Sequence, residues 1–174
     1  MSFKINKSIE FDYGHRIASH KSKCFHPHGH RGRVVAYCGA TDVIQEGEQS
    51  GMVLDFSFLK EILMTKVHDV LDHKFIICID DTLLLKNFLQ EDFVDSRINR
   101  MLDRNFYLLT SADGFNLVLV PVPPTAENLA KLIFQEIKED IALRSDGNAW
   151  LLKLEFWETP TSCASFTEAH IVYH

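Results

Sequence analysis

Seven consecutive residues, Cys24 to His30, place one thiol and three imidazoles close together in the order Cys-Phe-His-Pro-His-Gly-His. In an extended chain, side chains two residues apart share a face, so His28 and His30 would point together. Catalytic zinc typically has three protein ligands and one open position, so a third ligand must come from another segment. His15 is the candidate, because it continues the inward row of the preceding apolar strand. The sequence therefore predicts a catalytic zinc site of His15, His28 and His30; the alternative is a chance His-x-His pair beside a partly buried ring.

The thiol of Cys24 could be a reactive thiolate, a fourth metal ligand or an inert group. Lys21, Lys23 and a bound cation would each favour the thiolate, which is the reactive form. His26 lies beside Pro27, where irregular backbone favours a ring at the surface or behind the ligands over a ligand itself. We therefore expect a reactive Cys24 next to the predicted zinc site.

Carboxylates elsewhere are candidates for proton transfer and substrate binding. Asp72 precedes His73 at a helix end, where a histidine is favourable with the helix dipole but could also be a carboxylate-supported acid or base. Glu158 continues the inward row of an alternating strand, where an unpaired carboxylate is costly. It either accepts N–H donors from a heterocycle at a pocket floor or is solvated because the strand ends one residue earlier. Thr125 and Glu127 are most simply helix-capping residues.

Length and composition restrict the class of protein. The chain has 174 residues, 46% hydrophobic and 24% charged, which fits one folded domain over residues 1–174. The net charge of −6 argues against nucleic acid or an anionic membrane as the main partner, and no apolar run approaches the ~20 residues that span a bilayer. Four widely spaced cysteines without a CxxC pair, and no apolar run at the N-terminus, predict free thiols in the cytoplasm.

The elements that must position these residues follow from periodicity. Alternation predicts strands at 3–13, 28–44, 150–158 and 164–173, with Gly32 and Gly39 as possible bulge sites. Three- and four-residue spacing predicts helices at 56–72 and 125–144, capped by Asp55 and Thr125. Two hairpins flanking two helices indicate an α+β fold, a four-stranded antiparallel sheet with both helices on one face.

Residues 74–123 fit no single element. An apolar run at 75–79 is compatible with a strand, and residues 80–104 have roughly helical spacing. Residues 107–120 could form a hairpin, because Asp113-Gly114 is a turn dipeptide.

Taken together, the motifs carry a family resemblance. His15, Cys24-x-x-x-His28-Gly29-His30, Leu71-Asp72-His73, Pro124-Thr125-x-Glu127-Asn128 and Trp157-Glu158-Thr159 occur in that order over nearly the whole chain. This set resembles the 6-pyruvoyltetrahydropterin synthase / 6-carboxytetrahydropterin synthase family. The resemblance implies the tunnelling fold (T-fold), with trimers that close a barrel and pair into hexamers.

The resemblance also implies roles for the site residues. His15, His28 and His30 would hold Zn²⁺, Cys24 would be the proton-abstracting thiolate, and Asp72 and His73 would be its relay partners, either in the same subunit or across a subunit interface. Glu158 would anchor the pterin, with Thr125 and Glu127 nearby. The implied substrate is 7,8-dihydroneopterin triphosphate. The implied product is 6-carboxytetrahydropterin, toward queuosine, because three residues separate Cys24 from the His-Gly-His as in the bacterial carboxy branch.

Three alternatives stay open. A longer gap after the cysteine is typical of 6-pyruvoyltetrahydropterin synthase, which eliminates triphosphate instead. A zinc-stabilised family member without catalysis could recruit partners through residues 74–123, and a folate-branch aldolase of the same fold would be expected to use a glutamate where this chain has Cys24. The chain departs from the family in the 51 positions from His73 to Pro124, an apparent insertion at about 74–123, and in Arg31-Gly32-Arg33 after the His-Gly-His.

Overall fold

The central hairpin pairs the two strands that carry the predicted metal ligands. The computed structural model describes residues 2–89 and 104–168. Strand β1 (Phe3–His15) runs antiparallel to β2 (His28–Ala40) in one unbroken register from Phe3 opposite Ala40 to His15 opposite His28. The turn between the strands holds a short 3₁₀ helix, η1 (Lys23–Phe25). The first predicted strand is therefore confirmed, and the second ends four residues before its predicted end.

The sheet has seven strands in the order β4-β5-β3-β1-β2-β6-β7, so the prediction of four was wrong. Strand β6 (Trp150–Thr159) pairs with β2, and β7 (Ser162–Phe166) pairs with β6. On the other side, β3 (Lys74–Cys78) pairs in parallel with β1, and β5 (Asn116–Val120) lies between β3 and β4 (Tyr107–Thr110). The last strand is shorter than predicted, and residues 169–173 of that prediction lie outside the described residues.

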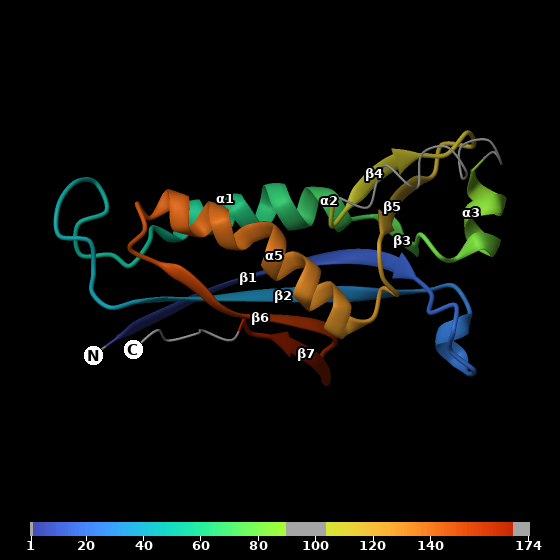
Figure 1. Ribbon diagram of the computed structural model, residues 1–174, viewed down its shortest axis with the longest axis horizontal. Coiled ribbons are helices and arrows are strands. Elements are labelled where there is room, and N and C mark those ends of the chain that lie inside the picture. The colour runs from blue at the N-terminus through green and yellow to red at the C-terminus, as the bar shows by residue number, and fades with distance from the viewer. Residues whose placement is uncertain (1, 90–103, 169–174) are drawn as a thin grey trace.

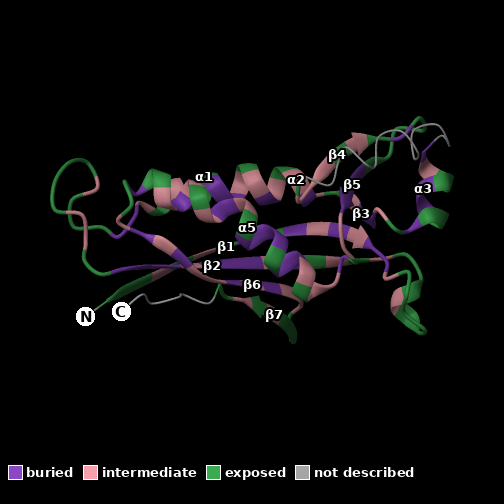
Figure 2. Ribbon diagram, in the orientation of Figure 1, coloured by how far each residue is buried: buried purple, intermediate pink, exposed green. Residues whose placement is uncertain are grey.

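Two helical segments cover one face of the central strands (Figure 1). The first is α1 (Phe56–Leu63), which continues through a π-helical turn, η2 (Met64–His68), into α2 (Asp69–Leu71). The second is α5 (Ala126–Arg144), whose N-cap Thr125 accepts a hydrogen bond from the Asn128 backbone N–H. Buried side chains of α5, such as Phe134, meet Phe156 and Val34 of the sheet in one hydrophobic core, seen as purple bands in Figure 2.

The described residues of the segment at 74–123 build a second, smaller core. Within β3, Ile76 belongs to the main core and its neighbour Ile77 to the second core, so the two cores lie on opposite faces of the sheet. The short helix α3 (Thr82–Phe88) packs there through Leu84 and Leu85. The run at 75–79 is therefore a strand, and the predicted hairpin around Asp113-Gly114 is confirmed as β4–β5. Helical structure at 80–104 is observed only in α3, and residues 90–103 lie outside the described residues.

Gly32 and Gly39 are not bulges in the β1–β2 ladder, since the register passes through both without a shift. The β2–β6 register shifts instead between Tyr37 and Cys38. At Gly32 a Cβ atom would lie 2.9 Å from the ring of Tyr13, so the glycine leaves room for that ring. No helix in residues 2–89 and 104–168 is long and apolar enough to cross a membrane.

Candidate metal centre and active site

Three imidazoles converge at one end of the central hairpin. Because β1 and β2 are in register, His15 lies opposite His28, and His30 follows two residues along β2 on the same face. Their potential ligand atoms all lie within 4.8 Å of one another. His15 is buried at 1% exposure, and the other two rings are partly exposed. The three histidines therefore converge as the sequence predicted.

Backbone carbonyls orient two of the rings. His15 Nδ1 donates to the Pro124 carbonyl at 2.8 Å, and His28 Nδ1 donates to the His26 carbonyl at 2.8 Å. A carbonyl oxygen can only accept, so in both rings Nδ1 carries the proton and Nε2 keeps its lone pair. His26 therefore orients the candidate ligand His28 through its backbone carbonyl.

The donor set fits a cation. The Nε2 atoms of His15 and His30 are buried without a hydrogen-bond partner among the described residues, which is costly in a protein interior. Burial lowers the pKa of His15 to about 4, although its bond to Pro124 opposes that shift. Burial also lowers the pKa of His30. Neutral imidazoles with free, inward lone pairs are the form that binds zinc and similar divalent metals.

A cavity of about 270 Å³ beside the imidazoles gathers most of the other predicted site residues. Its walls include Cys24, Thr125, Glu127 and Glu158, together with His15. Thr125 is also the helix cap that the sequence predicted, and Glu127 lies in the first turn of α5. The α5 N-terminus, the end of β6 and the turn after β1 thus meet at one place.

The carboxylate of Glu158 points to the imidazoles rather than into bulk solvent. Glu158 Oε1 lies 3.5 Å from His15 Nε2 and 3.8 Å from His30 Nε2, and the side chain is 28% exposed. The register of β6 against β7 shifts between Trp157 and Thr159, so Glu158 lies at an irregularity near the strand end. The inward orientation predicted from strand alternation is therefore observed.

Cys24 differs in its surroundings from the two interior cysteines. Cys38 and Cys78 are buried, and burial raises the pKa of both thiols, that of Cys38 to about 12. Cys24 is partly exposed and lines the cavity. Cys163 on β7 is exposed and lines the same cavity, a position for which its sequence context gave no signal.

Asp72 and His73 form a linked pair at a different place. Asp72 Oδ2 is 2.8 Å from His73 Nδ1, and Asp72 Oδ1 accepts from the Asp12 backbone N–H at 3.0 Å. His73 has a φ of 53° and is 78% exposed. Within the described part of the chain, neither residue lines the Cys24 cavity; His73 lines another, of about 490 Å³, with Phe75 and Phe88. One copy of the chain therefore does not bring the predicted relay to Cys24.

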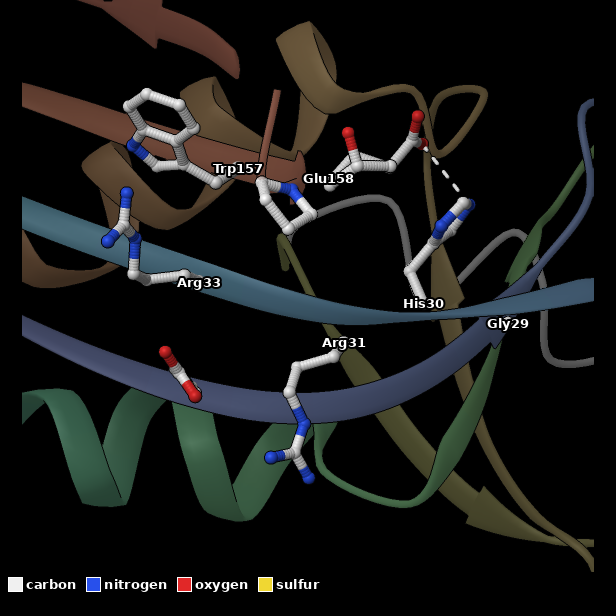
Figure 3. A pocket seen from close by; sticks show the side chains of 9 residues that line it. Gly29, His30, Arg31, Arg33, Trp157 and Glu158 are labelled. Carbon is white, nitrogen blue, oxygen red and sulfur yellow. Dashed lines mark ion pairs between the residues drawn. The ribbon is translucent and has the colours of Figure 1, made fainter. Parts of the chain in front are cut away.

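A third cavity, of about 460 Å³, opens where Glu158 meets the strand after the His-Gly-His (Figure 3). Arg33 stacks over the Trp157 ring at 4.7 Å, and Arg31 forms an ion pair with Asp12 at 2.9 Å. Figure 3 shows the Glu158 carboxylate directed toward the His30 ring, and the dashed line marks this ion pair. The two unusual arginines of the sequence thus line a cavity that also includes His30 and Glu158.

Two interior polar groups near the site were missed by sequence reasoning. The Tyr13 hydroxyl is buried without a hydrogen-bond partner among the described residues, and the ring lies 5.2 Å from that of His15. Arg16 and Asp81 form an ion pair at 6% and 3% exposure. Alternation predicted Tyr13 as an inward ring, but nothing in the sequence links Arg16 to a residue 65 positions away.

Known proteins resemble this chain over almost its full length. The model of the family described as 6-pyruvoyl tetrahydropterin synthase matches residues 4–169. A protein of Haemophilus influenzae named 6-carboxy-5,6,7,8-tetrahydropterin synthase is 31% identical over 166 residues, covering 95% of this chain and 99% of that one. A protein of the same name from Rickettsia conorii is 28% identical, covering 90% and 94%.

Solved structures agree with the fold. An uncharacterized protein of Wolinella succinogenes superposes with a TM-score of 0.71 at 26% identity, covering 97% of this chain and 99% of that one. The 6-pyruvoyltetrahydropterin synthase of Plasmodium vivax has a TM-score of 0.62 at 21% identity, with 97% and 98% covered, and supports the fold alone. With a family match over residues 4–169 and a relative at 31% identity, the chain belongs to the 6-pyruvoyl tetrahydropterin synthase family.

Proposed function

We propose that this protein is a zinc-dependent lyase that converts 7,8-dihydroneopterin triphosphate and one water molecule to 6-carboxytetrahydropterin, acetaldehyde and triphosphate. The observation that carries the proposal is one place where free imidazole nitrogens, the Cys24 thiol and the Glu158 carboxylate meet. The name of the Haemophilus influenzae relative supports the carboxy product. The cytoplasm and queuosine synthesis are the proposed setting.

His15, His28 and His30 would hold the zinc ion, since their ligand atoms converge and the Nε2 atoms of His15 and His30 are buried without a hydrogen-bond partner among the described residues. Bound there, zinc would supply Lewis-acid stabilisation to oxygens of the substrate side chain. The Pro124 and His26 carbonyls keep two of the rings in the orientation that this requires.

Cys24 is the proposed base, taking a proton from the substrate side chain as a thiolate. It is partly exposed in the cavity, which the exposed Cys163 also lines, whereas Cys38 and Cys78 are buried and burial raises the pKa of both thiols. Glu158 would accept N–H donors from the pterin ring, and Thr125 and Glu127 would border the ring in the same cavity.

Asp72 and His73 would complete the proton relay from a second copy of the chain. Within the described residues of one copy, neither residue lines the Cys24 cavity and His73 lines a different one, so the proposed relay needs a subunit interface. The proposed assembly is a trimer that pairs into a hexamer, in which the exposed His73 imidazole of one copy faces the Cys24 cavity of its neighbour.

The test is to incubate the zinc-loaded protein with 7,8-dihydroneopterin triphosphate and to identify the products by mass. Acetaldehyde together with a carboxypterin supports the proposal, and a pyruvoyl product would assign the chain to triphosphate elimination instead. A fully zinc-loaded protein that converts nothing would contradict catalysis and favour a zinc-stabilised binding protein. Cys24→Ala should keep the fold and the zinc but lose turnover, with Cys38→Ala as the control thiol.

A further inference from the structure

A buried ion pair joins the end of β1 to the segment that follows β3. Arg16 Nε donates to Asp81 Oδ2 at 2.6 Å, and Nη2 donates to Oδ1 at 2.5 Å, a two-point contact between a planar guanidinium and a carboxylate. Arg16 is 6% exposed and Asp81 is 3% exposed. The desolvation free energy of two buried charges offsets much of the Coulombic attraction between them, so a gain in stability is a weak explanation for such a pair.

Asp81 is itself held firmly. Its Oδ1 accepts from the Leu84 backbone N–H at 3.2 Å, so the same carboxylate caps α3 and binds the guanidinium. Its backbone N–H donates to the Cys78 carbonyl at the end of β3. The guanidinium is therefore fixed to the second core of the molecule.

The guanidinium also reaches the turn that carries Cys24. Its central carbon lies 5.0 Å from the centre of the Phe25 ring, in the geometry of a cation–π contact. Next to Arg16, the Ile17 backbone N–H donates to the Cys24 carbonyl at 2.7 Å. Residues 16 and 17 thus contact the turn at the Phe25 ring and at the Cys24 backbone carbonyl.

We propose that Arg16, fixed by Asp81, is a positioning residue that holds the η1 turn so that the Cys24 thiol stays in the cavity with His15 and Glu158. The inference rests on the proposed function only for the role of Cys24 as the base. The chain Asp81–Arg16–Phe25 makes the segment after β3 part of the active-site support. A lysine at position 16 would keep the charge but lose both the two-point contact and the flat surface over Phe25.

The variants are Arg16→Lys, Asp81→Asn and the double variant Arg16→Met with Asp81→Leu. Each single substitution disturbs one side of a buried pair, so its folded fraction is measured first by circular dichroism. The double variant removes both charges and provides a folded protein without the pair. The control is Arg144→Lys: Arg144 pairs with Glu61 at 2.8 Å and lies 5.1 Å from the Phe58 ring, which combines an ion pair and a cation–π contact at an exposed position near the C-terminal end of α5.

Two readouts separate positioning from general structure. The first is the rate at which iodoacetamide labels Cys24 relative to Cys163, measured by peptide mass spectrometry; Cys163 is an internal reference on β7 in the same cavity. We expect this ratio to rise severalfold in the Arg16 and Asp81 variants and to stay constant in Arg144→Lys. The second is a fall in kcat by roughly tenfold or more, with KM and zinc content near the wild-type values, because the thiol rather than the pterin contacts is displaced.

A labelling ratio and a kcat that both match the wild type in the folded double variant would overturn the proposal. If activity falls only in proportion to the folded fraction and the labelling ratio stays constant, the Arg16–Asp81 pair has a structural role alone, and the proposal is likewise overturned. If the wild type fails to convert the pterin triphosphate, the proposed function fails, while the labelling ratio still decides whether Arg16 positions Cys24.

Discussion

At the level of single residues, two backbone carbonyls decide which nitrogen each imidazole presents. Pro124 and His26 accept from Nδ1 of His15 and His28, which leaves both Nε2 atoms directed at the same space. Pro124 immediately precedes the N-cap of α5, so the start of that helix also orients a ligand on β1. The geometry of the three-histidine site therefore depends on the packing of α5 against the sheet.

The first prediction separates a ligand from its support. His30→Ala should lower zinc affinity by at least about a hundredfold, because one of three donors is lost. His26→Ala should keep near-normal affinity, since the His26 backbone carbonyl that accepts from His28 remains. Zinc binding is measured by competition with a chelating dye. Equal losses in the two variants would mean that the His26 side chain binds the metal as well.

Whether a feature of the site could be predicted depends on how far apart along the sequence the interacting residues are. His28 and His30 share a face because strands alternate, and Glu158 points inward for the same reason. The contact of Arg16 with Asp81 spans 65 positions and depends on how β3 joins the sheet. No local pattern carries that information, so the pair could be found only in the folded chain.

At the level of elements, the helices and the two hairpins were predicted because each is encoded within a short window of sequence. The three additional strands were not assigned to the sheet, because β3 joins β1, and β5 joins β3, through parallel pairing between distant segments. Their runs of four or five residues are also too short for periodicity to separate strand from helix. The fold class was accessible from local patterns, and the strand count was not.

The second prediction concerns the junction of β1 and β3. A Cβ atom at Gly14 would lie 2.7 Å from Cδ2 of Phe75, so Gly14→Ala should lower the free energy of unfolding by roughly 1–3 kcal/mol. Phe75→Leu removes the ring atoms that clash, so the double variant should lose less than the sum of the two single variants. Urea denaturation of all four proteins gives the coupling. Strictly additive losses would show that the side chains at positions 14 and 75 do not contact each other.

The third prediction is a pH dependence on the sheet face away from α5. Burial alone would raise the pKa of Glu155, but hydrogen bonds from Lys153, Trp157 and Tyr37 outweigh it and hold the pKa below the usual 4.5. The stabilisation is therefore complete above about pH 4.5 and is lost as the pH falls through the lower folded-state pKa.

Glu155→Gln should accordingly cost about 1–3 kcal/mol of unfolding free energy at pH 7, and this difference from the wild type should shrink below pH 4.5. Urea denaturation between pH 3 and 7 measures it. The control is Glu61→Gln, which removes an ion pair of 2.8 Å whose carboxylate is 54% exposed, and should change stability by less than about 1 kcal/mol. A Glu155→Gln deficit that is constant down to pH 3 would contradict the assigned pKa direction.

At the level of the whole molecule, the proposed catalytic groups lie at two separate places on one sheet. The Cys24 cavity lies between the end of β6 and the start of α5, whereas Asp72 and His73 lie beside the β1–β3 junction. Within the described residues of one copy, the exposed His73 imidazole is bonded to Asp72 and lies outside the Cys24 cavity. Assembly of several copies would bring the two places together.

The last prediction tests this assembly by mixing inactive variants. Cys24→Ala and His73→Ala are each expected to be inactive, but subunits refolded together in equal amounts should recover about a quarter of the wild-type activity, because one interface in about four combines an intact thiol with an intact imidazole. Cys24→Ala mixed with Glu158→Gln is the control. Cys24 and Glu158 line the same cavity of one copy, so no interface in that mixture contains a complete cavity, and activity should stay at background. Recovery in both mixtures would indicate that Glu158 acts across the interface, and recovery in neither would place the proton relay within one chain or remove His73 from it.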